Sequence, residues 1–422
     1  MRRARRAFSV LGAAAAIAAA ANAQATPRSG FSAARLARID SAIQRYVDSQ
    51  QVAGVVALVL KDGAPVYQRA VGWADREAGR RMTPDAVFRI ASQSKAITST
   101  AVMMLAEEGR LGIDDAVSRY IPAFAKTRVA VQADSGRAIV PARRAITIRD
   151  LLTHTAGISY GVESLVAPLY EAAALGPKAG YGWYTADKNE PICTTIERLA
   201  TLPFVAQPGE RFVYGYNTDI LGCVVERVSG KALDVFIRER ITAPLKMKDT
   251  QFFLPAEQRA RLTAVYASAS DGRFVRAPDG PRGQGDYVDG PRMSFSGGAG
   301  LLSTAADYAR FLETIRRGGA LDGVRILSPR GAQLMHTNMA GALHGDGLGF
   351  GLGFETTDRF GANGFSTEGS YGWGGAYGTF YRVDPTEGLV MVLMQQLMPD
   401  ATTLKVRFPT LVMQALVEPR RK

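Results

Sequence analysis

The stretch FRIASQSKAITSTAVMMLAEEG, residues 88–109, holds one lysine and several hydroxyl side chains in an otherwise apolar, helix-prone run. It predicts a helix that opens near Ser92 and stops at Gly109. Residues three apart share a face of a helix, so Lys95 is expected to place its amine beside the Ser92 hydroxyl. A lysine gains nothing in the core of a helix, and it therefore either reaches solvent or has a chemical role.

The pairing of Ser92 with Lys95 favours nucleophilic catalysis. A serine hydroxyl is a poor nucleophile until a base removes its proton, and a desolvated lysine amine can be that base. The helix N-terminus adds backbone N–H groups that can stabilise an oxyanion. The pattern S-x-x-K is nevertheless short enough to occur by chance, and taken alone it leaves a solvent-facing lysine as the better interpretation.

The segments around this helix predict an α/β (α+β) fold. Residues 54–75 read as two strands joined at Asp62-Gly63, a common hairpin turn signal, and residues 374–396 read as two more strands before a terminal helix. Both chain ends are therefore expected to share one antiparallel sheet flanked by helices, with a mainly helical lobe inserted. The expected parts are residues 31–110 and 291–422 for the sheet domain and residues 111–290 for the helical and loop domain.

Two shorter patterns lie inside the expected lobe. TIRDLLTHTAG (147–157) has a capping box formed by Thr147 and Asp150, followed by a glycine exit. The Gly-, Tyr- and Pro-containing residues 158–192 predict a surface loop. Within them GPKAGYGWY (176–184) either borders the acyl or alcohol pocket or is an ordinary loop.

The N-terminal residues 1–23 have the order of a cleavable export signal: arginines, an Ala-rich apolar run, and small residues before Gln24. Arg5-Arg6-Ala7-Phe8 also loosely matches a twin-arginine signal. The apolar run is too short and too weakly hydrophobic to span a bilayer well. We therefore expect a periplasmic or secreted protein without a stable membrane anchor.

The composition of the 422 residues is that of an ordinary globular protein, with 47% hydrophobic and 21% charged residues. The formal net charge is +12, but its arginines are scattered beyond the N-terminal signal, so no nucleic-acid partner is expected. Cys193 and Cys223 are the only cysteines. Export permits a disulfide, yet two buried thiols are equally compatible with the sequence, and the oligomeric state is open as well.

Several further segments make the S-x-x-K pattern more than a coincidence. Together they resemble the serine β-lactamase and penicillin-recognising enzyme superfamily, over nearly all of the mature chain. The class C β-lactamase branch, with the family VIII carboxylesterases, is the most similar. The resemblance implies a β-lactamase/transpeptidase-like fold and no cofactor. The segments are FRIASQSKAITS, LLTHTAGI (151–158), GERFVYGYNTDILGCVVERVSG (209–230), SGGAGLLSTAADYARFL (296–312) and YGWGGAYGTFYRVDP (371–385).

The resemblance implies a role for each motif residue. The nucleophile falls on Ser92, the motif lysine on Lys95, and the catalytic tyrosine on Tyr214. The third motif falls on Trp373-Gly374-Gly375, on a strand lining the site, where glycines let substrate lie against bare backbone. The backbone N–H groups of Ser92 and Ala376 would form the oxyanion hole.

Two departures from the family pattern point to the substrate. Trp373 stands in place of the lysine or histidine that engages the carboxylate of a β-lactam, and an indole carries no charge. Tyr216 replaces an asparagine that contacts an amide of the substrate, although Asn217 is adjacent. Both changes favour an uncharged, more apolar small molecule, which Tyr216, Trp373, Gly374 and Gly375 are expected to contact.

These residues lead to the hypothesis of a serine carboxylesterase that cleaves short-chain esters through an acyl-enzyme on Ser92. The alternative is a class C-like β-lactamase or a D-amino-acid peptidase, and a third reading is a binding protein without turnover. A Ser-His-Asp triad is disfavoured, because His154 lies in an implied structural turn and no G-x-S-x-G occurs; GFSTEG (364–369) comes closest. His336 and His344 lack metal-ligand spacing, and we expect no metal.

Overall fold

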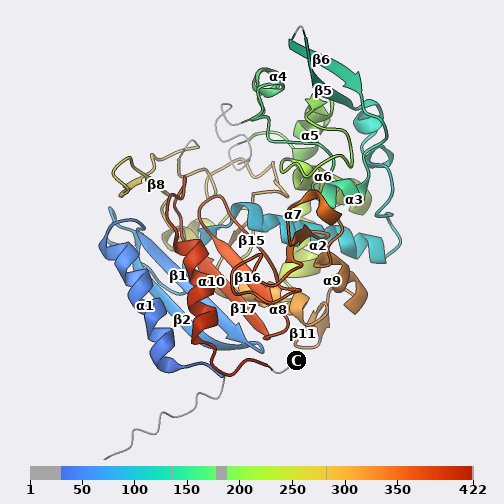
Figure 1. Cartoon of the computed structure of the whole chain (residues 1–422). Helices are drawn as coiled ribbons and strands as arrows, with labels where there is room; N and C mark the ends of the chain where they lie inside the picture. Colours follow the sequence, from blue (N-terminus) through green and yellow to red (C-terminus); the bar gives the residue numbers. More distant parts are fainter. Residues whose placement is uncertain (1–29, 135, 177–187, 282, 421–422) are drawn as a thin grey trace, which may run out of the picture.

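An antiparallel sheet of eight strands lies at the centre of the fold, with the strand order β13-β14-β15-β16-β17-β1-β2-β3 (Figure 1). The computed structural model describes residues 30–134, 136–176, 188–281 and 283–420. The strand bounds are β1 Gly54–Lys61, β2 Ala64–Asp75, β3 Arg80–Arg81, β13 Leu348–Phe350, β14 Glu355–Thr357, β15 Tyr371–Gly374, β16 Phe380–Asp384 and β17 Leu389–Met394. The expected α/β fold with an antiparallel sheet is confirmed.

The first long strand and the last strand of the chain meet in the middle of this sheet. β1 pairs with β17, so that Val56 lies opposite Met394. The β1–β2 turn uses Asp62 and Gly63 with φ angles of 54° and 84°, the left-handed region that this dipeptide tolerates. In Figure 1 the blue N-terminal and red C-terminal segments consequently form one layer. The sheet is thus built from both chain ends, as the sequence predicts.

Helices cover both faces of the sheet, which explains the unbroken apolar run in β1. Val55, Ala57 and Val59 pack with α1 and α10, which lie side by side in Figure 1. Val56 and Leu58 face the larger core, to which α2 and α8 contribute. Because both alternating sets are buried, the strand has no polar face. The helix bounds are α1 Ala33–Asp48, α2 Ser94–Glu107, α8 Ala305–Arg316, α9 Pro329–Met335 and α10 Leu404–Ala415.

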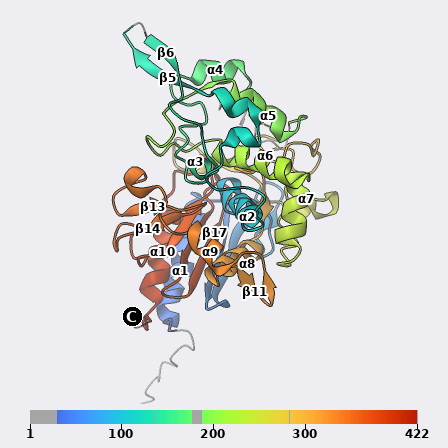
Figure 2. The same cartoon turned by 90° about the vertical axis from the view of Figure 1, so that its right-hand side faces the viewer.

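A second part of the molecule, mostly helical, rises from the sheet on the side away from α1 and α10 (Figure 2). Thr147 and Asp150 form the expected capping box at the start of α3. Two elements differ from the prediction. A short helix, α4, lies within the expected loop 158–192, and an unpredicted hairpin, β5–β6, pairs with β7. The bounds are α3 Ile148–Leu152, α4 Ala167–Ala172, α5 Ile192–Ala200, α6 Asn217–Ser229, α7 Leu233–Ile237, β5 Arg128–Ala133, β6 Gly136–Pro141 and β7 Pro203–Phe204.

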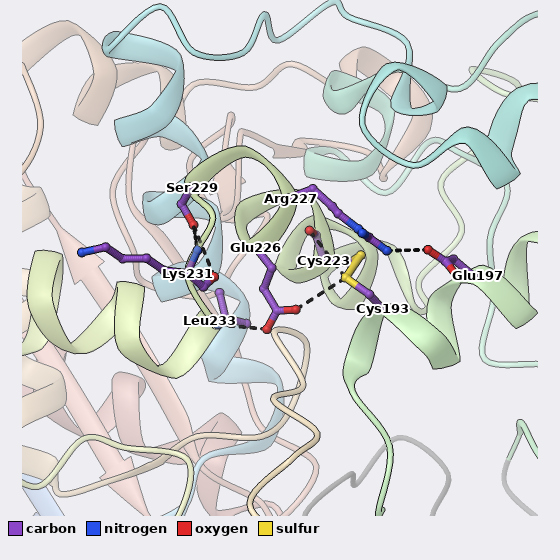
Figure 3. The surroundings of a disulfide bond; sticks show 8 residues. All are labelled: Cys193, Glu197, Cys223, Glu226, Arg227, Ser229, Lys231 and Leu233. Atoms are coloured by element: carbon purple, nitrogen blue, oxygen red, sulfur yellow. Dashed lines mark hydrogen bonds and ion pairs between the residues drawn. A yellow bond between two sulfur atoms is a disulfide. The ribbon is translucent and has the colours of Figure 1, made fainter.

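A disulfide between Cys193 and Cys223 joins α5 to α6 (Figure 3). The sequence leaves the state of these two thiols open, and the structure shows them bonded, with Cα atoms 5.1 Å apart. Glu226 lies beside the bridge and accepts a hydrogen bond from the backbone N–H of Leu233 at 2.9 Å. Since α6 also packs on α2, the bridge ties α5 to the helix that carries Lys95.

Three two-stranded sheets and the three-stranded sheet β6-β5-β7 complete the described fold. Tyr266 and Phe274, on the hairpin β8–β9, pack in the core under α1 and α10, although the expected boundaries place them in the helical and loop part. No helix among the described residues is long and apolar enough to cross a bilayer. The pairs are β4 Phe88–Arg89 with β10 Leu302–Ser303, β8 Tyr266–Ser268 with β9 Phe274–Arg276, and β11 Ala320–Leu321 with β12 Val324–Arg325, besides the β5–β6 hairpin.

Candidate active site

Ser92 lies in a 3-10 turn, η1 (Ala91–Gln93), that leads directly into α2. Lys95 is in the first turn of α2, and its Nζ donates to Ser92 Oγ at 3.3 Å. Ala91, just before the serine, has a φ of 41°, in a region that residues with a Cβ rarely adopt. Both functional side chains are buried, with 8% of Ser92 and 4% of Lys95 exposed. The structure therefore brings together the pair that the helical spacing predicts.

The Lys95 amine has two further acceptors that the sequence analysis does not anticipate. Nζ donates to Tyr160 Oη at 2.9 Å and to the carbonyl oxygen of Gly298 at 2.7 Å. With Ser92 Oγ, these give Lys95 Nζ three hydrogen-bonding neighbours, the number of acceptors that an ammonium needs once the amine has taken a proton. Burial raises the pKa of Tyr160 well above its ordinary value, so its phenol is neutral. Three neighbouring groups thus fix the lysine side chain next to the nucleophile.

A buried carboxylate holds the Gly298 carbonyl in position. Asp219 of α6 accepts hydrogen bonds from the Gly298 backbone N–H at 3.2 Å and from the Ser296 hydroxyl. A Cβ on Gly298 would lie 2.4 Å from Asp219 Oδ2, so only glycine permits this approach. Burial raises the pKa of Asp219, and the charge of Lys95 partly opposes that rise. Asp219 is therefore a positioning residue that acts on Lys95 through the single residue Gly298.

Tyr214 lies on the loop before α6, with its ring against the lysine. Lys95 Nζ is 4.7 Å from the centroid of the Tyr214 ring. Trp373, on β15, donates its Nε1–H to Tyr214 Oη at 3.0 Å. Because the phenol oxygen accepts this bond, its own O–H is free to point at another group. Trp373 thus orients Tyr214, a role beyond the substrate contact that the sequence predicts.

Three other residues of this region lie behind the catalytic candidates. His154 is buried, its ring 4.7 Å from that of Tyr214, and burial lowers its pKa well below the ordinary value, so it is uncharged. Asn217 Nδ2 donates to His154 Nδ1 at 2.9 Å. Tyr216 is 3% exposed, with its ring 4.9 Å from that of Tyr160. Tyr216, which the sequence predicts to contact the substrate, thus packs against Tyr160.

Gly375 lets β15 approach the turn that carries Ser92. A Cβ at this position would lie 2.5 Å from the carbonyl oxygen of Ile90, which is too close for any other residue. Ala376 consequently packs in one apolar cluster with Ala91. The two backbone N–H groups implied for the oxyanion hole, those of Ser92 and Ala376, thus belong to segments in mutual contact.

A cavity of about 630 Å³ opens at Ser92. Tyr214, Trp373, Gly374, Gly375 and Ala376 line it, whereas Tyr216 does not. Most of the suggested pocket segment 176–184 lies outside the described residues. The cavity has the size of an ordinary small-molecule site, and the candidate nucleophile is one of the residues that line it.

The histidines considered for a metal site have other partners. His336 stacks on Tyr371 with ring centroids 4.5 Å apart, and His344 Nε2 lies 3.1 Å from Glu355 Oε2. Within the residues that the structure describes, no group of three His, Cys, Asp or Glu side chains could hold a metal ion.

Comparison with known proteins places the chain in a family. The sequence model of the family described as Beta-lactamase matches residues 39–411. Protein Rv1367c of Mycobacterium tuberculosis is 35% identical over 382 residues, covering 85% of this chain and 90% of that protein. Esterase EstB of Burkholderia gladioli is 33% identical over 372 residues, covering 85% and 89%. The solved structure of EstCE1, described as a hydrolase with promiscuous acyltransferase activity, has a TM-score of 0.76 at 27% identity and covers 91% of this chain and 99% of that one.

The site and these relatives lead to one assignment. The relatives span nearly the full length of the chain, and two of them are named as an esterase and a hydrolase. The chain belongs to the β-lactamase family, near the family VIII carboxylesterases of the serine β-lactamase superfamily, and is a serine hydrolase of the carboxylesterase type.

Proposed function

We propose that the protein hydrolyses esters of short carboxylic acids through an acyl-enzyme on Ser92. The observation that carries the proposal is the Lys95 amine at the Ser92 hydroxyl, with the Tyr214 ring 4.7 Å from that amine and an indole where the family has a cation. A carboxylate-bearing β-lactam would find no free charge at position 373, whereas a neutral ester needs none.

The geometry supports a two-step acyl transfer. Ser92 Oγ attacks the ester carbonyl while its proton passes to the Lys95–Tyr214 pair, and the carbonyl oxygen becomes an oxyanion next to the N–H groups of Ser92 and Ala376. The C–O bond to the alcohol then breaks, and the same pair returns the proton to the alcohol oxygen. Water attacks the acyl-enzyme by the same route, which releases the acid and regenerates Ser92.

The test compares Ser92→Ala with the wild type on p-nitrophenyl acetate. We expect loss of hydrolysis, and we expect a fluorophosphonate probe to label the wild type only. Ser229→Ala, at the last position of α6 (Figure 3), is the control and should behave as the wild type. Near-normal hydrolysis by Ser92→Ala would reject the acyl-enzyme.

The match to the Beta-lactamase family supports a second candidate function, which is the hydrolysis of β-lactams or of D-amino-acid peptides. Values of kcat/KM for a chromogenic cephalosporin and for esters of graded acyl length separate the two. A higher value for the cephalosporin than for any simple ester would replace the proposal. A preference for long acyl chains would retain the esterase and reject the short-chain specificity.

We also propose that the protein is exported after cleavage of residues 1–23. The bond between Cys193 and Cys223 supports this proposal, since disulfides persist in oxidising compartments. Mass spectrometry of the protein from a periplasmic or secreted fraction should show a chain that begins at Gln24. A mass equal to that of the full 45.3 kDa chain would contradict the proposal.

A further inference from the structure

The cavity at Ser92 continues away from the catalytic residues as a cleft between α10 and the loop 363–366. Its floor is the face of the sheet that α10 leaves uncovered. Gly372 of β15 lies between Glu355 of β14 and Arg382 of β16 in the strand register, so these positions share one face. Glu355, Arg382 and Phe380 all line the cleft.

One glycine, Gly374, hollows the floor of this cleft. Side chains alternate along a strand, so Tyr371 and Trp373 of β15 face one side of the sheet while Gly372 and Gly374 face the other. A Cβ on Gly374 would meet only the carbonyl oxygen of Thr379, at 3.2 Å. The space above Gly374 is therefore open because the strand has no side chain there, and it leads directly to Ser92.

The walls of the cleft are apolar. Val406, Pro409 and Met413 line it from one face of α10, at spacings of three and four residues. Phe365 lines it from the opposite loop. Val406 is 67% exposed and Phe365 is 59% exposed, so neither side chain is buried in the hydrophobic core. Large apolar side chains exposed along a cleft next to a nucleophile indicate a binding surface.

The two cations of the cleft are already paired. Arg382 Nη2 donates to Glu355 Oε1 at 3.3 Å, and Lys405 Nζ lies 3.3 Å from Asp400 Oδ2. Both cations of the cleft therefore have an acidic partner, although the buried Arg382 Nη1 makes no hydrogen bond. An uncharged group loses less on leaving water here than a charged one.

The position of Tyr214 decides which half of an ester enters the cleft. The alcohol oxygen must receive a proton as it leaves, so it has to lie beside Tyr214 or Lys95. Tyr214 lines the cavity, and Lys95 lies behind Ser92 and does not. The leaving oxygen therefore has to face Tyr214, and Gly374, which lines the same cavity, leaves room for its substituent.

We propose that this cleft binds the alcohol part of the substrate and that this part is bulky, uncharged and apolar, such as a long alkyl chain or a ring system. The inference rests on the proposed esterase function and adds the identity of the leaving group. Attack by Ser92 breaks the acyl C–O bond, the alcohol oxygen takes the proton that Ser92 gave up, and the alcohol departs through the cleft. Phe365 and Val406 are the specificity-determining residues.

The test keeps the acyl group fixed and varies the alcohol, with acid release followed by titration at constant pH. The measured quantity is the ratio of kcat/KM for decyl acetate to that for ethyl acetate. We expect Phe365→Ala and Val406→Asp to lower this ratio about tenfold. Phe360→Ala is the matched control, because Phe360 is 62% exposed just upstream of the same loop and does not line the cleft. Its ratio should equal that of the wild type.

Three results would overturn the inference. A ratio unchanged by both cleft variants, with wild-type melting temperatures, would show that the cleft does not select the alcohol. A fall confined to the ratio of ethyl decanoate to ethyl acetate would show that the cleft holds the acyl chain. A wild-type protein that hydrolyses none of these esters, ethyl acetate and p-nitrophenyl acetate included, would instead remove the proposed esterase function on which the inference rests.

Discussion

Replacing Tyr160 by phenylalanine removes one oxygen atom from the catalytic cluster and changes little else. That oxygen accepts a hydrogen bond from Lys95 Nζ at 2.9 Å. The other acceptors of the amine are Ser92 Oγ at 3.3 Å and the Gly298 carbonyl at 2.7 Å. Since Lys95 is 4% exposed, bulk water has little access to the vacated position.

The size of the effect follows from the charge on the amine. When Lys95 takes the proton of Ser92 it becomes an ammonium with three N–H donors, and the variant leaves one of them without its acceptor. A hydrogen bond to a charged group contributes about 1.5–3 kcal/mol. At about 1.4 kcal/mol per tenfold in rate, Tyr160→Phe should lower kcat/KM by roughly 10- to 150-fold.

The assay is kcat/KM on p-nitrophenyl acetate, with a thermal melt to verify the fold. Tyr46→Phe is the matched control, because its hydroxyl also makes a hydrogen bond in a partly buried setting, 2.6 Å from Thr403 Oγ1, and neither residue lines the cavity at Ser92. We expect this control to keep wild-type activity. A Tyr160→Phe variant that melts like the wild type and stays within twofold of its kcat/KM would refute the reasoning.

Three further predictions concern hydrogen bonding, pH and the cross-link. Trp373→Phe loses the 3.0 Å bond to Tyr214, worth about 0.5–1.5 kcal/mol, and should lower kcat on p-nitrophenyl acetate roughly 2- to 12-fold; an unchanged kcat would contradict the orienting role. Burial raises the pKa of Asp307 from 3.8 to about 6, so the stability of the wild type should fall as the pH rises through about 6. Asp307→Asn removes this dependence. The unfolding free energy of the variant minus that of the wild type, measured by urea titration, should therefore increase by up to about 3 kcal/mol between acidic and neutral pH. A difference that does not change with pH would contradict this prediction. Replacing Cys193 and Cys223 together by alanine should lower the unfolding free energy by about 3–4 kcal/mol, which a urea titration without reductant measures and an equal midpoint would disprove.

The part of the site that could be predicted is the part held by local geometry. Ser92 and Lys95 meet because they are three residues apart at a helix start, a relation that a sequence specifies by itself. Tyr160 could not be found in this way, because it lies in a loop without periodicity and reaches Lys95 only through packing. The same holds for the bond from Trp373 to Tyr214, which depends on how β15 sits against the loop before α6.

The fold shows the same division between local and distant information. The Asp62-Gly63 turn and the last two strands can be predicted from the sequence, because the alternation of apolar and polar residues and the residue types of a turn are local features. The β5–β6 hairpin carries a similar signal, with Val129 and Val131 alternating before a turn, but short hairpins inside a helical region are easily missed. The Cys193–Cys223 bond depends on the packing of α5 against α6, which the spacing of two cysteines does not encode.

The pairing of β1 with β17 has a consequence for how the enzyme is made. The two ends also meet outside the sheet, where Phe31 bridges to Leu416. A ribosome must therefore synthesise almost the whole polypeptide before β1 can pair with β17. Ala376, which follows β15, also lies 284 residues after Ser92 in the chain, so the cavity at Ser92 is completed only late in synthesis.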